Sequence, residues 1–254
     1  MKSILTIAGS DPTGGAGLQA DIRVFNRLGV HALSVTTALT AQNTGGVDAV
    51  LGIDAQFIEM QLNSLLNDIR PDALKTGMLY SKDAVRVIAK TIRGFDLDNL
   101  VVDPVTMSSS GRPLIEDGGL DIMRNELFPL AKVITPNIYE AYVLSGISIT
   151  DEKSMEKACM TLSNFGPEAI IITGGHLEHE TIDMVYFEDN FVKLKSKKID
   201  GEFHGTGCTF SAAIAAYIAK EFSLVHAAEK AKDFVYDAII KAHAIGKGMK
   251  LLDV

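Results

Sequence analysis

His204-Gly205-Thr206-Gly207-Cys208-Thr209-Phe210-Ser211 brings two glycines directly before an amphipathic helical pattern. The apolar residues that follow recur at the spacing that gives a helix one buried face. They are Phe210, Ala213, Ile214, Tyr217 and Ile218. We therefore predict a helix over residues 208–220 that begins near Gly207 or Cys208.

The start of this helix has the properties of an anion-binding site. The first turn of a helix leaves backbone N–H groups without partners and carries the positive end of the helix dipole. Glycines let a ligand approach the backbone closely. Cys208 lies in this field, which we expect to lower its thiol pKa from ~8.5 and make it a proton acceptor or nucleophile. A glycine-rich turn into an ordinary core helix remains the alternative.

The composition of the 254 residues is typical of a well-packed soluble protein, with 47% hydrophobic and 22% charged residues. We expect a single domain over residues 1–254. The net charge of −8 would repel a nucleic-acid backbone, and no long run of Lys or Arg offers a local exception. Nucleic acid is therefore a poor candidate for a partner.

Cysteine content and apolar segments bear on the compartment. Cys159 and Cys208 are too few for a disulfide framework, which fits reducing conditions. The apolar stretch within residues 1–9 is shorter than a signal-peptide core. No run approaches the ~18 apolar residues that a membrane span needs. We expect a cytoplasmic protein with no membrane partner.

Short apolar runs alternate with helical patterns along the whole chain. We predict strands at 3–8, 33–38, 73–76, 99–103, 131–135, 169–173, 183–187 and 191–195. We predict helices at 16–28, 54–68, 82–93, 117–127, 138–144, 152–165, 208–220 and 224–244. This alternation predicts an α/β fold in which a mostly parallel central sheet is covered by helices on both faces. The last two strands form a hairpin with an acidic turn, which predicts a small antiparallel edge.

Small or hydrogen-bonding residues follow most of the predicted strands. Ligands of open parallel sheets bind at the carboxyl ends of the strands, so these clusters predict a cleft for a polar ligand there. The clusters are residues 9–17, 40–46, 76–78, 103–105, 135–137 and 173–176.

Several polar residues in these clusters have two possible roles. Asn137 and Glu140 have the spacing of a capping box, but their place after a strand also permits Asn137 to contact phosphate and Glu140 to hold Mg²⁺ through water. Asp103 ends a buried strand, where a carboxylate is costly unless it is paired. The Gln42 amide could bind an aminated heterocycle or could satisfy a turn.

Gly15-Ala16-Gly17-Leu18-Gln19-Ala20 matches the dinucleotide fingerprint G-x-G-x-x-A. The fingerprint needs a tight turn directly after the strand and an acidic residue at the end of the second strand. Six residues separate Ala8 from Gly15, and no acid follows Leu39 closely. An NAD-dependent oxidoreductase is therefore a weaker alternative.

Taken together and in this order, the motifs closely resemble the hydroxymethylpyrimidine/phosphomethylpyrimidine kinases of thiamine biosynthesis. The motifs that carry the resemblance are Ala8-Gly9-Ser10-Asp11-Pro12, Gly14-Gly15-Ala16-Gly17 with Gln19-Ala20-Asp21, Ala41-Gln42-Asn43-Thr44, Lys75-Thr76-Gly77-Met78-Leu79, Asp103-Pro104-Val105, Thr135-Pro136-Asn137 with Glu140-Ala141, Gly174-Gly175-His176 and His204-Gly205-Thr206-Gly207-Cys208-Thr209. The resemblance implies a ribokinase-like three-layer α/β/α sandwich. It also implies phosphorylation of 4-amino-5-hydroxymethyl-2-methylpyrimidine by MgATP, and then of its monophosphate to the diphosphate.

The resemblance also implies site residues for the substrate and for the chemistry. Gln42 would hydrogen-bond the pyrimidine, and Gly9, Asp21 and Met78 would line its pocket. Cys208 would accept the proton of the alcohol. The backbone of Gly205, Thr206 and Gly207 would bind the phosphoryl group in transfer.

The remaining residues that the resemblance assigns concern ATP and Mg²⁺. Asp103 and Glu140 would serve the metal, and Asn137, Thr173 and Gly205 would serve the nucleotide. Thr173 and the segment around Ser109 stand where the family usually has lysines. Homodimers are usual in the family, so we expect one here. Pyridoxal kinase, which has the same fold, is the main alternative, and a ligand-binding protein without catalysis is another.

Overall fold

The structure is a computed structural model that describes residues 1–108, 110–176 and 180–254. Within these residues the chain forms a nine-stranded sheet in the order β3-β2-β1-β4-β5-β6-β7-β8-β9 and a two-stranded sheet, β10-β11. The strands are β1 (Ser3–Ser10), β2 (His31–Asn43), β3 (Gly46–Gly52), β4 (Ala73–Thr76), β5 (Leu100–Val102), β6 (Ala131–Ile134), β7 (Ala169–His176), β8 (Glu180–Phe187), β9 (Asn190–Lys197), β10 (Phe203–His204) and β11 (Lys250–Leu251).

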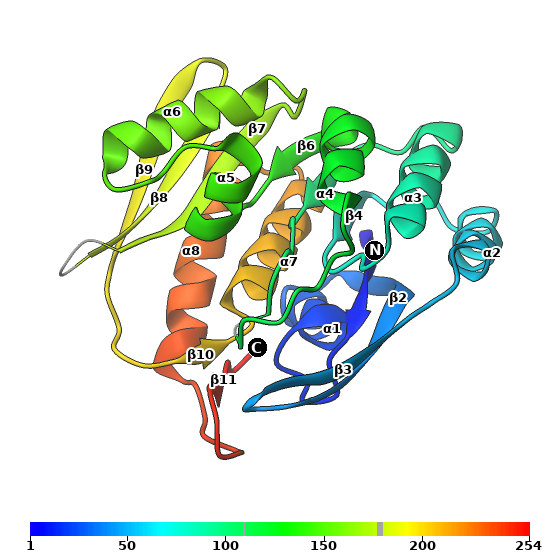
Figure 1. Cartoon of the computed structure of the whole chain (residues 1–254), viewed down its shortest axis with the longest axis horizontal. Helices are drawn as coiled ribbons and strands as arrows, with labels where there is room; N and C mark the ends of the chain where they lie inside the picture. The colour runs from blue at the N-terminus through cyan, green and yellow to red at the C-terminus, as the bar shows by residue number, and fades with distance from the viewer. Residues whose placement is uncertain (109, 177–179) are drawn as a thin grey trace.

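Helices connect most of these strands. They are α1 (Gly17–Arg27), α2 (Ala55–Leu66), α3 (Lys82–Gly94), α4 (Gly119–Ile122), α5 (Ile138–Ser145), α6 (Glu152–Ser163), α7 (Thr206–Ala219) and α8 (Leu224–Ile240). A π-helical turn (Met123–Leu127) and a 3₁₀ turn (Phe128–Leu130) follow α4. Helices lie on both faces of the sheet (Figure 1), which confirms the expected three-layer α/β/α sandwich.

The centre of the sheet is parallel and its edges are antiparallel. β1 pairs in parallel with both β2 and β4, and parallel pairing continues through β5 and β6 to β7. β8 and β9 form the predicted antiparallel hairpin. The strand order reverses at β1 and β4, because the chain adds β2 and β3 on one side and then crosses to the other. Such a reversal opens a crevice at the carboxyl ends of the strands.

Side chains of the central strands alternate between two apolar layers, as the pleat of a strand requires. Leu5 and Val102 face the layer that contains buried residues of α2, α3, α5 and α6. Ile4 and Val101 face the layer that contains buried residues of α1, α7 and α8. Burial on both faces explains why these strands are apolar throughout.

The predicted elements occur at the predicted places, but the hairpin β2–β3 and the short strands β10 and β11 were missed. β2 continues through Asn43, whereas the prediction ended it at residue 38, and β3 was not predicted. The outer half of β2 and all of β3 alternate between half-buried and exposed residues, so no continuous apolar run marks them. The predicted helix at 117–127 is a short α-helix followed by a π-helical turn, and α7 begins at Thr206 rather than at Gly207 or Cys208.

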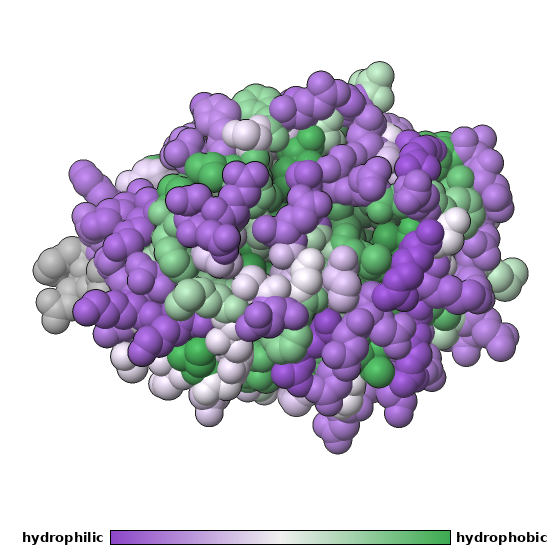
Figure 2. Space-filling view, turned by 90° about the horizontal axis from the view of Figure 1, so that it is seen from above, coloured by the Kyte–Doolittle hydropathy of each residue, from purple (hydrophilic) through white to green (hydrophobic). Residues whose placement is uncertain are grey.

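One face of the molecule is largely polar (Figure 2). Figure 2 shows hydrophilic side chains spread over the face seen from above, with apolar areas between them. In the parts of the chain that the structure describes, no helix is both long and apolar enough to cross a membrane.

Gly205 fixes the start of α7 against the loop that follows β1. It is the N-cap residue of α7 and has φ of 82°, in the left-handed region that favours glycine. A Cβ atom at this position would lie 1.7 Å from the carbonyl oxygen of Gly15. Backbone therefore packs directly on backbone here, and only glycine fits.

We predict that Gly205→Ala lowers the free energy of unfolding by ~3 kcal/mol or more, because it combines a left-handed φ with a backbone clash. Urea denaturation monitored by circular dichroism measures this change. Gly94→Ala is the matched control, because its Cβ would meet open space at the end of α3. The control should change stability by no more than ~1 kcal/mol, in the stabilising direction. Equal stability of Gly205→Ala and the wild type would show that the contact with Gly15 is not rigid.

Candidate functional site

A cavity of about 210 Å³, here called the Gln42 cavity, opens at the carboxyl ends of the central strands. It lies at the reversal of the strand order, where the topology predicts a ligand site. Its polar lining comes from elements that are far apart in the sequence. The lining residues used below are Gly9, Ser10, Asp11, Thr40, Gln42, Met78, Asp103, Asn137, Glu140, Thr173, His204, Gly205, Thr206, Gly207 and Cys208.

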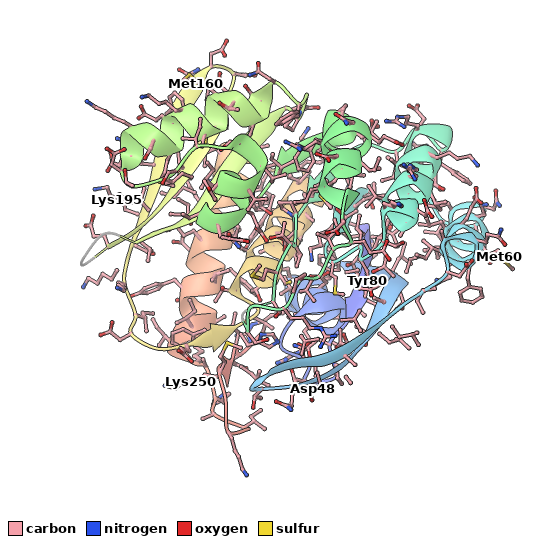
Figure 3. All side chains as sticks on the ribbon, in the orientation of Figure 1. Asp48, Met60, Tyr80, Met160, Lys195 and Lys250 are labelled. Atoms are coloured by element: carbon pink, nitrogen blue, oxygen red, sulfur yellow. The ribbon has the colours of Figure 1, made fainter. Side chains whose placement is uncertain are left out.

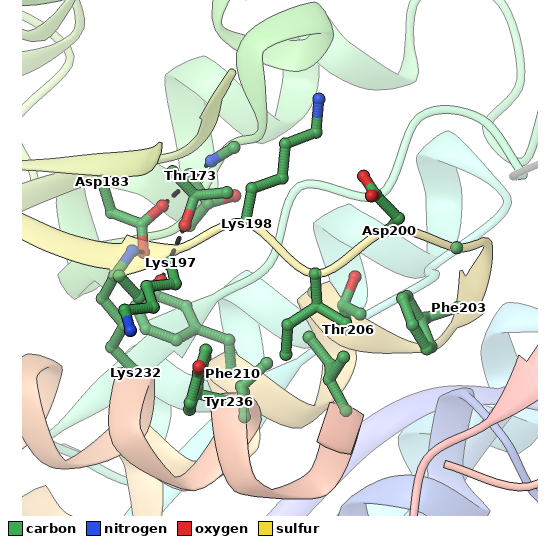
Figure 4. Close-up of a pocket in the computed structure, with 18 residues that line it drawn as sticks. Thr173, Asp183, Lys197, Lys198, Asp200, Phe203, Thr206, Phe210, Lys232 and Tyr236 are labelled. Carbon is green, nitrogen blue, oxygen red and sulfur yellow. Dashed lines mark hydrogen bonds and ion pairs between the residues drawn. The ribbon is translucent and has the colours of Figure 1, made fainter. Parts of the chain in front are cut away.

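A second cavity of about 360 Å³, here called the Tyr236 cavity, lies between α7, α8 and the β7–β9 side of the sheet. Figure 4 shows its lining side chains, among them Lys197, Lys198, Phe210 and Tyr236. The two cavities share Thr173, Phe203, Thr206 and Gly207. They therefore meet at the first turn of α7.

The first turn of α7 has the geometry of an anion site. Gly205 ends the preceding turn. The first hydrogen bond within the helix is the one in which the Thr209 N–H donates to the Gly205 carbonyl at 2.9 Å. The N–H groups of Thr206, Gly207 and Cys208 come before this bond in the helix. Gly207 has open space where a Cβ would be. The backbone of this turn can therefore donate hydrogen bonds to an anion that reaches it from either cavity.

The expected acidity of Cys208 is wrong for the protein without a ligand. Burial, which outweighs the opposing charge of Lys75, and the nearby carboxylates of Asp103 and Asp21 raise the pKa of the Cys208 thiol to about 12. The field of the helix N-terminus is weaker than these effects. Cys208 nevertheless lines the Gln42 cavity beside the anion site.

Asp21 does not line the cavity, contrary to the prediction. Its carboxylate is fully buried and accepts a hydrogen bond from Lys75 Nζ at 2.9 Å and another from the Thr6 hydroxyl. Burial by itself would lower the pKa of Lys75, but the carboxylate of Asp21, together with Cys208 and Asp103, raises it above the usual value. Lys75 is therefore a permanent positive charge beneath the site.

Asp103 lies at the end of β5 and is almost completely buried. It accepts a hydrogen bond from the Ser211 hydroxyl of α7 at 3.0 Å. Burial raises the pKa of Asp103, and Lys75 opposes this effect. The carboxylate thus lies in the cavity with one buried hydrogen-bond donor and one buried cation nearby.

Asn137 and Glu140 form the capping box that their spacing predicts. The Asn137 side chain accepts from the Glu140 N–H at 2.9 Å, and Glu140 Oε2 accepts from the Asn137 N–H at 3.0 Å. Glu140 Oε1 accepts from the Thr106 N–H at 3.2 Å. Burial and the neighbouring Asp103 raise the pKa of Glu140 to about 8. Both residues also line the Gln42 cavity, so the structural and the functional reading are compatible.

Gln42 lies in β2 and not in a loop after it. A register shift between Ala41 and Gln42 interrupts the pairing with β3 at this point. Its terminal amide lies 3.0 Å from His204 Nε2 on one side and 3.2 Å from Thr40 Oγ1 on the other. The amide is thus held by neighbouring side chains and still lines the cavity.

Asp11, Thr40 and His204 line the same cavity, and the sequence reasoning did not select them as site residues. His204 Nε2 lies 2.8 Å from Asp11 Oδ2, and the imidazole ring is buried. Burial would raise the pKa of Asp11, but hydrogen bonds from His204 and Thr13 hold it below its usual value. Asp11 and Thr40 occur in predicted polar clusters and His204 opens the glycine-rich stretch before α7, but no spacing rule joins residues so far apart.

Gly9 and Met78 form an apolar part of the cavity wall. A Cβ at Gly9 would lie 3.0 Å from Met78 Sδ, so the two residues are in close contact.

The hairpin that carries Gln42 is held from outside by the chain near the C-terminus. There the Met249 N–H donates to the Thr44 carbonyl at 3.0 Å and the Gly248 N–H donates to Thr44 Oγ1 at 3.1 Å.

The Tyr236 cavity contains both charged and aromatic side chains. Lys232 Nζ donates to Asp183 Oδ2 at 2.7 Å, and the N–H of Gly174 donates to Asp183 Oδ1 at 3.0 Å (Figure 4). Asp183 therefore fixes the backbone next to Thr173. Thr173 is joined to the capping-box segment through its N–H, which donates to the Pro136 carbonyl at 2.9 Å. Ser109, the other position without the family's usual lysine, lies outside the described residues.

The glycines of the dinucleotide fingerprint serve packing. A Cβ at Gly17 would lie 2.4 Å from the Gly9 carbonyl oxygen, and one at Gly15 would lie 2.6 Å from the His204 ring. These glycines thus let the loop after β1 pack against β1 and against β10. The oxidoreductase alternative loses its structural basis.

The geometry as a whole fits the transfer of an anionic group between two bound molecules. Each cavity can hold one molecule, and the anion site lies where the cavities meet. Within residues 1–108, 110–176 and 180–254, no group of three or more His, Cys, Asp or Glu forms a metal cage. A metal ion at this site would need further ligands from its substrates.

Comparison with known proteins agrees with this chemistry. Residues 11–253 match the family model described as phosphomethylpyrimidine kinase. The chain is 38% identical over 247 residues to a hydroxymethylpyrimidine/phosphomethylpyrimidine kinase of Bacillus subtilis, with 96% of this chain and 91% of that protein covered. It is 41% identical over 248 residues to a thiamine biosynthesis bifunctional protein ThiED of Geobacter sulfurreducens.

The chain spans about half the length of such bifunctional relatives, 51% in the case of the Geobacter protein, although the match covers 97% of this chain. Among solved structures, an ADP complex of Bacillus subtilis pyridoxal kinase is similar, with a TM-score of 0.91, 35% identity and coverage of 100% of this chain and 97% of that one. The family match extends over nearly the whole sequence and includes the lining of both cavities except Gly9 and Ser10. The chain belongs to the phosphomethylpyrimidine kinase family.

Proposed function

We propose that the protein phosphorylates 4-amino-5-hydroxymethyl-2-methylpyrimidine with ATP, and then phosphorylates the monophosphate to the diphosphate, in thiamine biosynthesis. The observation that carries the proposal is the meeting of two cavities at the first turn of α7. Phosphoryl transfer depends mainly on positioning and on stabilisation of charge. A row of fixed backbone donors between two binding cavities supplies both.

The Gln42 cavity is the proposed pyrimidine site. The Gln42 amide can donate one hydrogen bond and accept another, which matches the ring nitrogen and amino group of an aminopyrimidine. Gly9 and Met78 provide an apolar wall for the ring. The size of the cavity, about 210 Å³, suits a single small ring.

The Tyr236 cavity is the proposed ATP site. Phe210 and Tyr236 offer apolar and aromatic surface for a base, and Lys197 and Lys198 offer positive charge. These lysines would supply charge that the family usually obtains from lysines at the positions of Thr173 and Ser109. Asn137, Thr173 and the backbone of Gly205 would contact phosphate at the junction of the cavities.

The residues present fit Mg²⁺ bound together with ATP. Mg²⁺ in kinases is held by one or two carboxylates, by substrate phosphates and by water. Asp103 has a carboxylate in the cavity, and Glu140, whose oxygens both accept backbone N–H groups, would act through water. Bound Mg²⁺ would neutralise phosphate charge, and Asp103 and Glu140 would fix its position.

Cys208 is the proposed acceptor of the hydroxyl proton. In the transfer, the substrate oxygen bonds to the terminal phosphorus, the bond from that phosphorus to the ADP oxygen breaks, and the alcohol proton leaves. Sγ lies beside the anion site. Because burial keeps the Cys208 thiol protonated in the protein without ligands, Sγ would take this proton only after the positive charge of Mg²⁺ bound nearby had lowered its pKa. The N–H groups of Thr206, Gly207 and Cys208 would stabilise the charge on the phosphoryl oxygens.

We also propose a cytoplasmic homodimer. Leu39 and Leu51 face each other across the β2–β3 pair and are exposed, as are Phe57 and Met60 of the adjacent α2. Figure 3 shows Met60 of α2 at the right-hand edge of the molecule. An apolar edge of this kind suits a second copy of the chain.

Pyridoxal phosphorylation is the second candidate, because a pyridoxal kinase is among the similar structures at 35% identity. Pyridoxal is also a six-membered ring with a hydroxymethyl group. It lacks the amino group next to this substituent. The chemistry at Gln42 therefore decides between the two substrates.

We predict that the protein with MgATP and the hydroxymethylpyrimidine releases ADP and forms first the monophosphate and then the diphosphate. Mass spectrometry of the products over time measures both steps. Pyridoxal in place of the pyrimidine should give slower turnover. An absence of ADP with the pyrimidine, under conditions in which the protein is folded, would contradict the proposal.

We predict that Gln42→Ala raises the KM for the pyrimidine about tenfold, because it removes a donor and an acceptor that the ring needs. The KM for ATP should change little, since Gln42 does not line the Tyr236 cavity. Steady-state kinetics with each substrate varied in turn measure the two constants. An equal rise in both constants would remove Gln42 from the pyrimidine site.

We predict that Cys208→Ala lowers kcat at least ~10-fold with little change in either KM, the pattern of a group that acts in the transition state. Single-turnover kinetics with saturating MgATP measure the loss directly. Cys159→Ala, at a buried cysteine of α6 that lines neither cavity, is the matched control. An unchanged kcat in Cys208→Ala would leave this residue a packing role.

A further inference from the structure

Five side chains and one carbonyl form a continuous chain of hydrogen bonds through Gln42. The Thr40 hydroxyl donates to the Ser10 carbonyl at 2.9 Å and lies 3.2 Å from the Gln42 amide. On its other side the amide lies 3.0 Å from His204 Nε2, which lies 2.8 Å from Asp11 Oδ2. Thr13 continues the chain by donating to Asp11. We call the members Ser10, Thr40, Gln42, His204 and Asp11 the Gln42 relay.

Asp11 determines where His204 carries hydrogen. The Asp11 carboxylate already accepts from the Thr13 N–H and hydroxyl and from the Ala16 N–H, at 2.8 to 2.9 Å. Its lowered pKa agrees with an ionised group, which can only accept. His204 Nε2 must therefore carry a hydrogen that it donates to Asp11, in the neutral ring and in the charged ring alike.

This hydrogen determines which Gln42 atom faces His204. With Gln42 Nε2 toward His204, as in the structure, two N–H donors face each other at 3.0 Å. A half-turn of the terminal amide exchanges Oε1 and Nε2 without moving any other group. The Gln42 oxygen then accepts the Nε2 hydrogen of His204, and the Asp11 carboxylate accepts the same hydrogen.

Thr40 leads to the same orientation independently. Its hydroxyl has one hydrogen, and the Ser10 carbonyl at 2.9 Å can only accept it. Toward Gln42 the Thr40 oxygen must then accept, so it needs the amide NH₂ group and not the amide oxygen. Both ends of the relay thus select the exchanged amide.

We propose that the Gln42 relay fixes the polarity of the Gln42 amide, with Oε1 on the side of His204 and Nε2 on the side of Thr40, and thereby selects and orients an aminopyrimidine. In this state the amide keeps one oxygen lone pair and one N–H for the cavity. The inference deepens the proposed function and rests on the assignment of the Gln42 cavity to the pyrimidine. Thr40, His204 and Asp11 act as positioning residues, since they work through Gln42.

The fixed polarity defines how the ring lies. Along one edge of the pyrimidine, the hydroxymethyl group, the amino group and the ring nitrogen N3 follow in this order. The amino group donates to Gln42 Oε1 on the His204 side, and N3 accepts from Nε2–H on the Thr40 side. Because His204 directly precedes Gly205, this orientation directs the hydroxymethyl group toward the first turn of α7.

The same polarity works against rings with the opposite pattern. A 4-oxo analogue, in which oxygen replaces the amino group and N3 carries hydrogen, places an acceptor against Oε1 and a donor against Nε2–H. Pyridoxal, which has a formyl oxygen next to its hydroxymethyl group, also brings an acceptor to Oε1. A buried site strongly rejects a ligand that leaves its polar groups unpaired or that places two donors or two acceptors opposite each other.

Isothermal titration calorimetry of the wild type and Thr40→Val with the 4-amino compound and its 4-oxo analogue tests the proposal. We expect the wild type to bind the 4-oxo analogue at least ~100-fold more weakly. Thr40→Val keeps the shape of the side chain but removes the acceptor for the amide NH₂. We expect it to reduce this ratio about tenfold, because only His204 then opposes the reversed amide that the 4-oxo analogue needs.

Two variants on the same strand serve as controls. Thr40→Ser keeps the hydroxyl and should restore the wild-type ratio. Thr36→Val lies four residues earlier on β2, outside both cavities, and should not change it. Equal weakening of both compounds in Thr40→Val would mean that Thr40 only supports the cavity, and would overturn the relay.

The outcomes separate the relay from the proposed function. If the wild type binds neither compound, the pyrimidine assignment itself fails. If it prefers the 4-amino compound and Thr40→Val keeps the same ratio, only the relay fails. Should Thr40→Val not fold, ¹⁵N NMR of the wild type decides, because the relay requires a protonated Nε2 in His204. A His204 Nε2 that carries no hydrogen would overturn the proposal.

Discussion

The contact of Gly205 with Gly15 is the constraint on which the site depends. It brings the start of α7 against the loop after β1, backbone to backbone, with no room for a side chain at Gly205. The first turn of α7 thereby lies between two cavities that are built from different parts of the chain. Without this close approach the helix dipole would face solvent, and neither cavity would share it.

Buried charges beneath this turn are arranged around the cation of Lys75. Lys75 and Asp21 form a fully buried pair in which each stabilises the charge of the other. Burial raises the pKa of Asp21 despite this pairing, and it also raises the pKa of Asp103, Glu140 and Cys208. A site with crowded carboxylates and a free helix N-terminus is suited to a ligand that carries both phosphate and a divalent cation.

The regular elements were predictable because their signals are local. Strands buried on both faces, such as β5, are continuous apolar runs, and helices with one buried face repeat every three or four residues. The hairpin β2–β3 gave no such signal, since its outer residues are half-buried or exposed and its pairing depends on a register shift near Gln42. The capping box at Asn137 was predictable for the same reason as the helices, because its partners are three residues apart.

The sequence by itself determined the α/β class, the order of the elements and the helix start at the glycines of α7, because each depends on neighbours within a few positions. As parts of a pyrimidine pocket, the cavity residues Gly9, Gln42 and Met78 were expected only from the resemblance to a known family. Tertiary structure alone decided that Asp21 pairs with Lys75 outside the cavity and that burial governs the acidity of Cys208. It also joined Asp11, Thr40 and His204 to Gln42. Hydrogen bonds and burial between segments up to 193 residues apart follow from how the chain packs, and no local pattern encodes them.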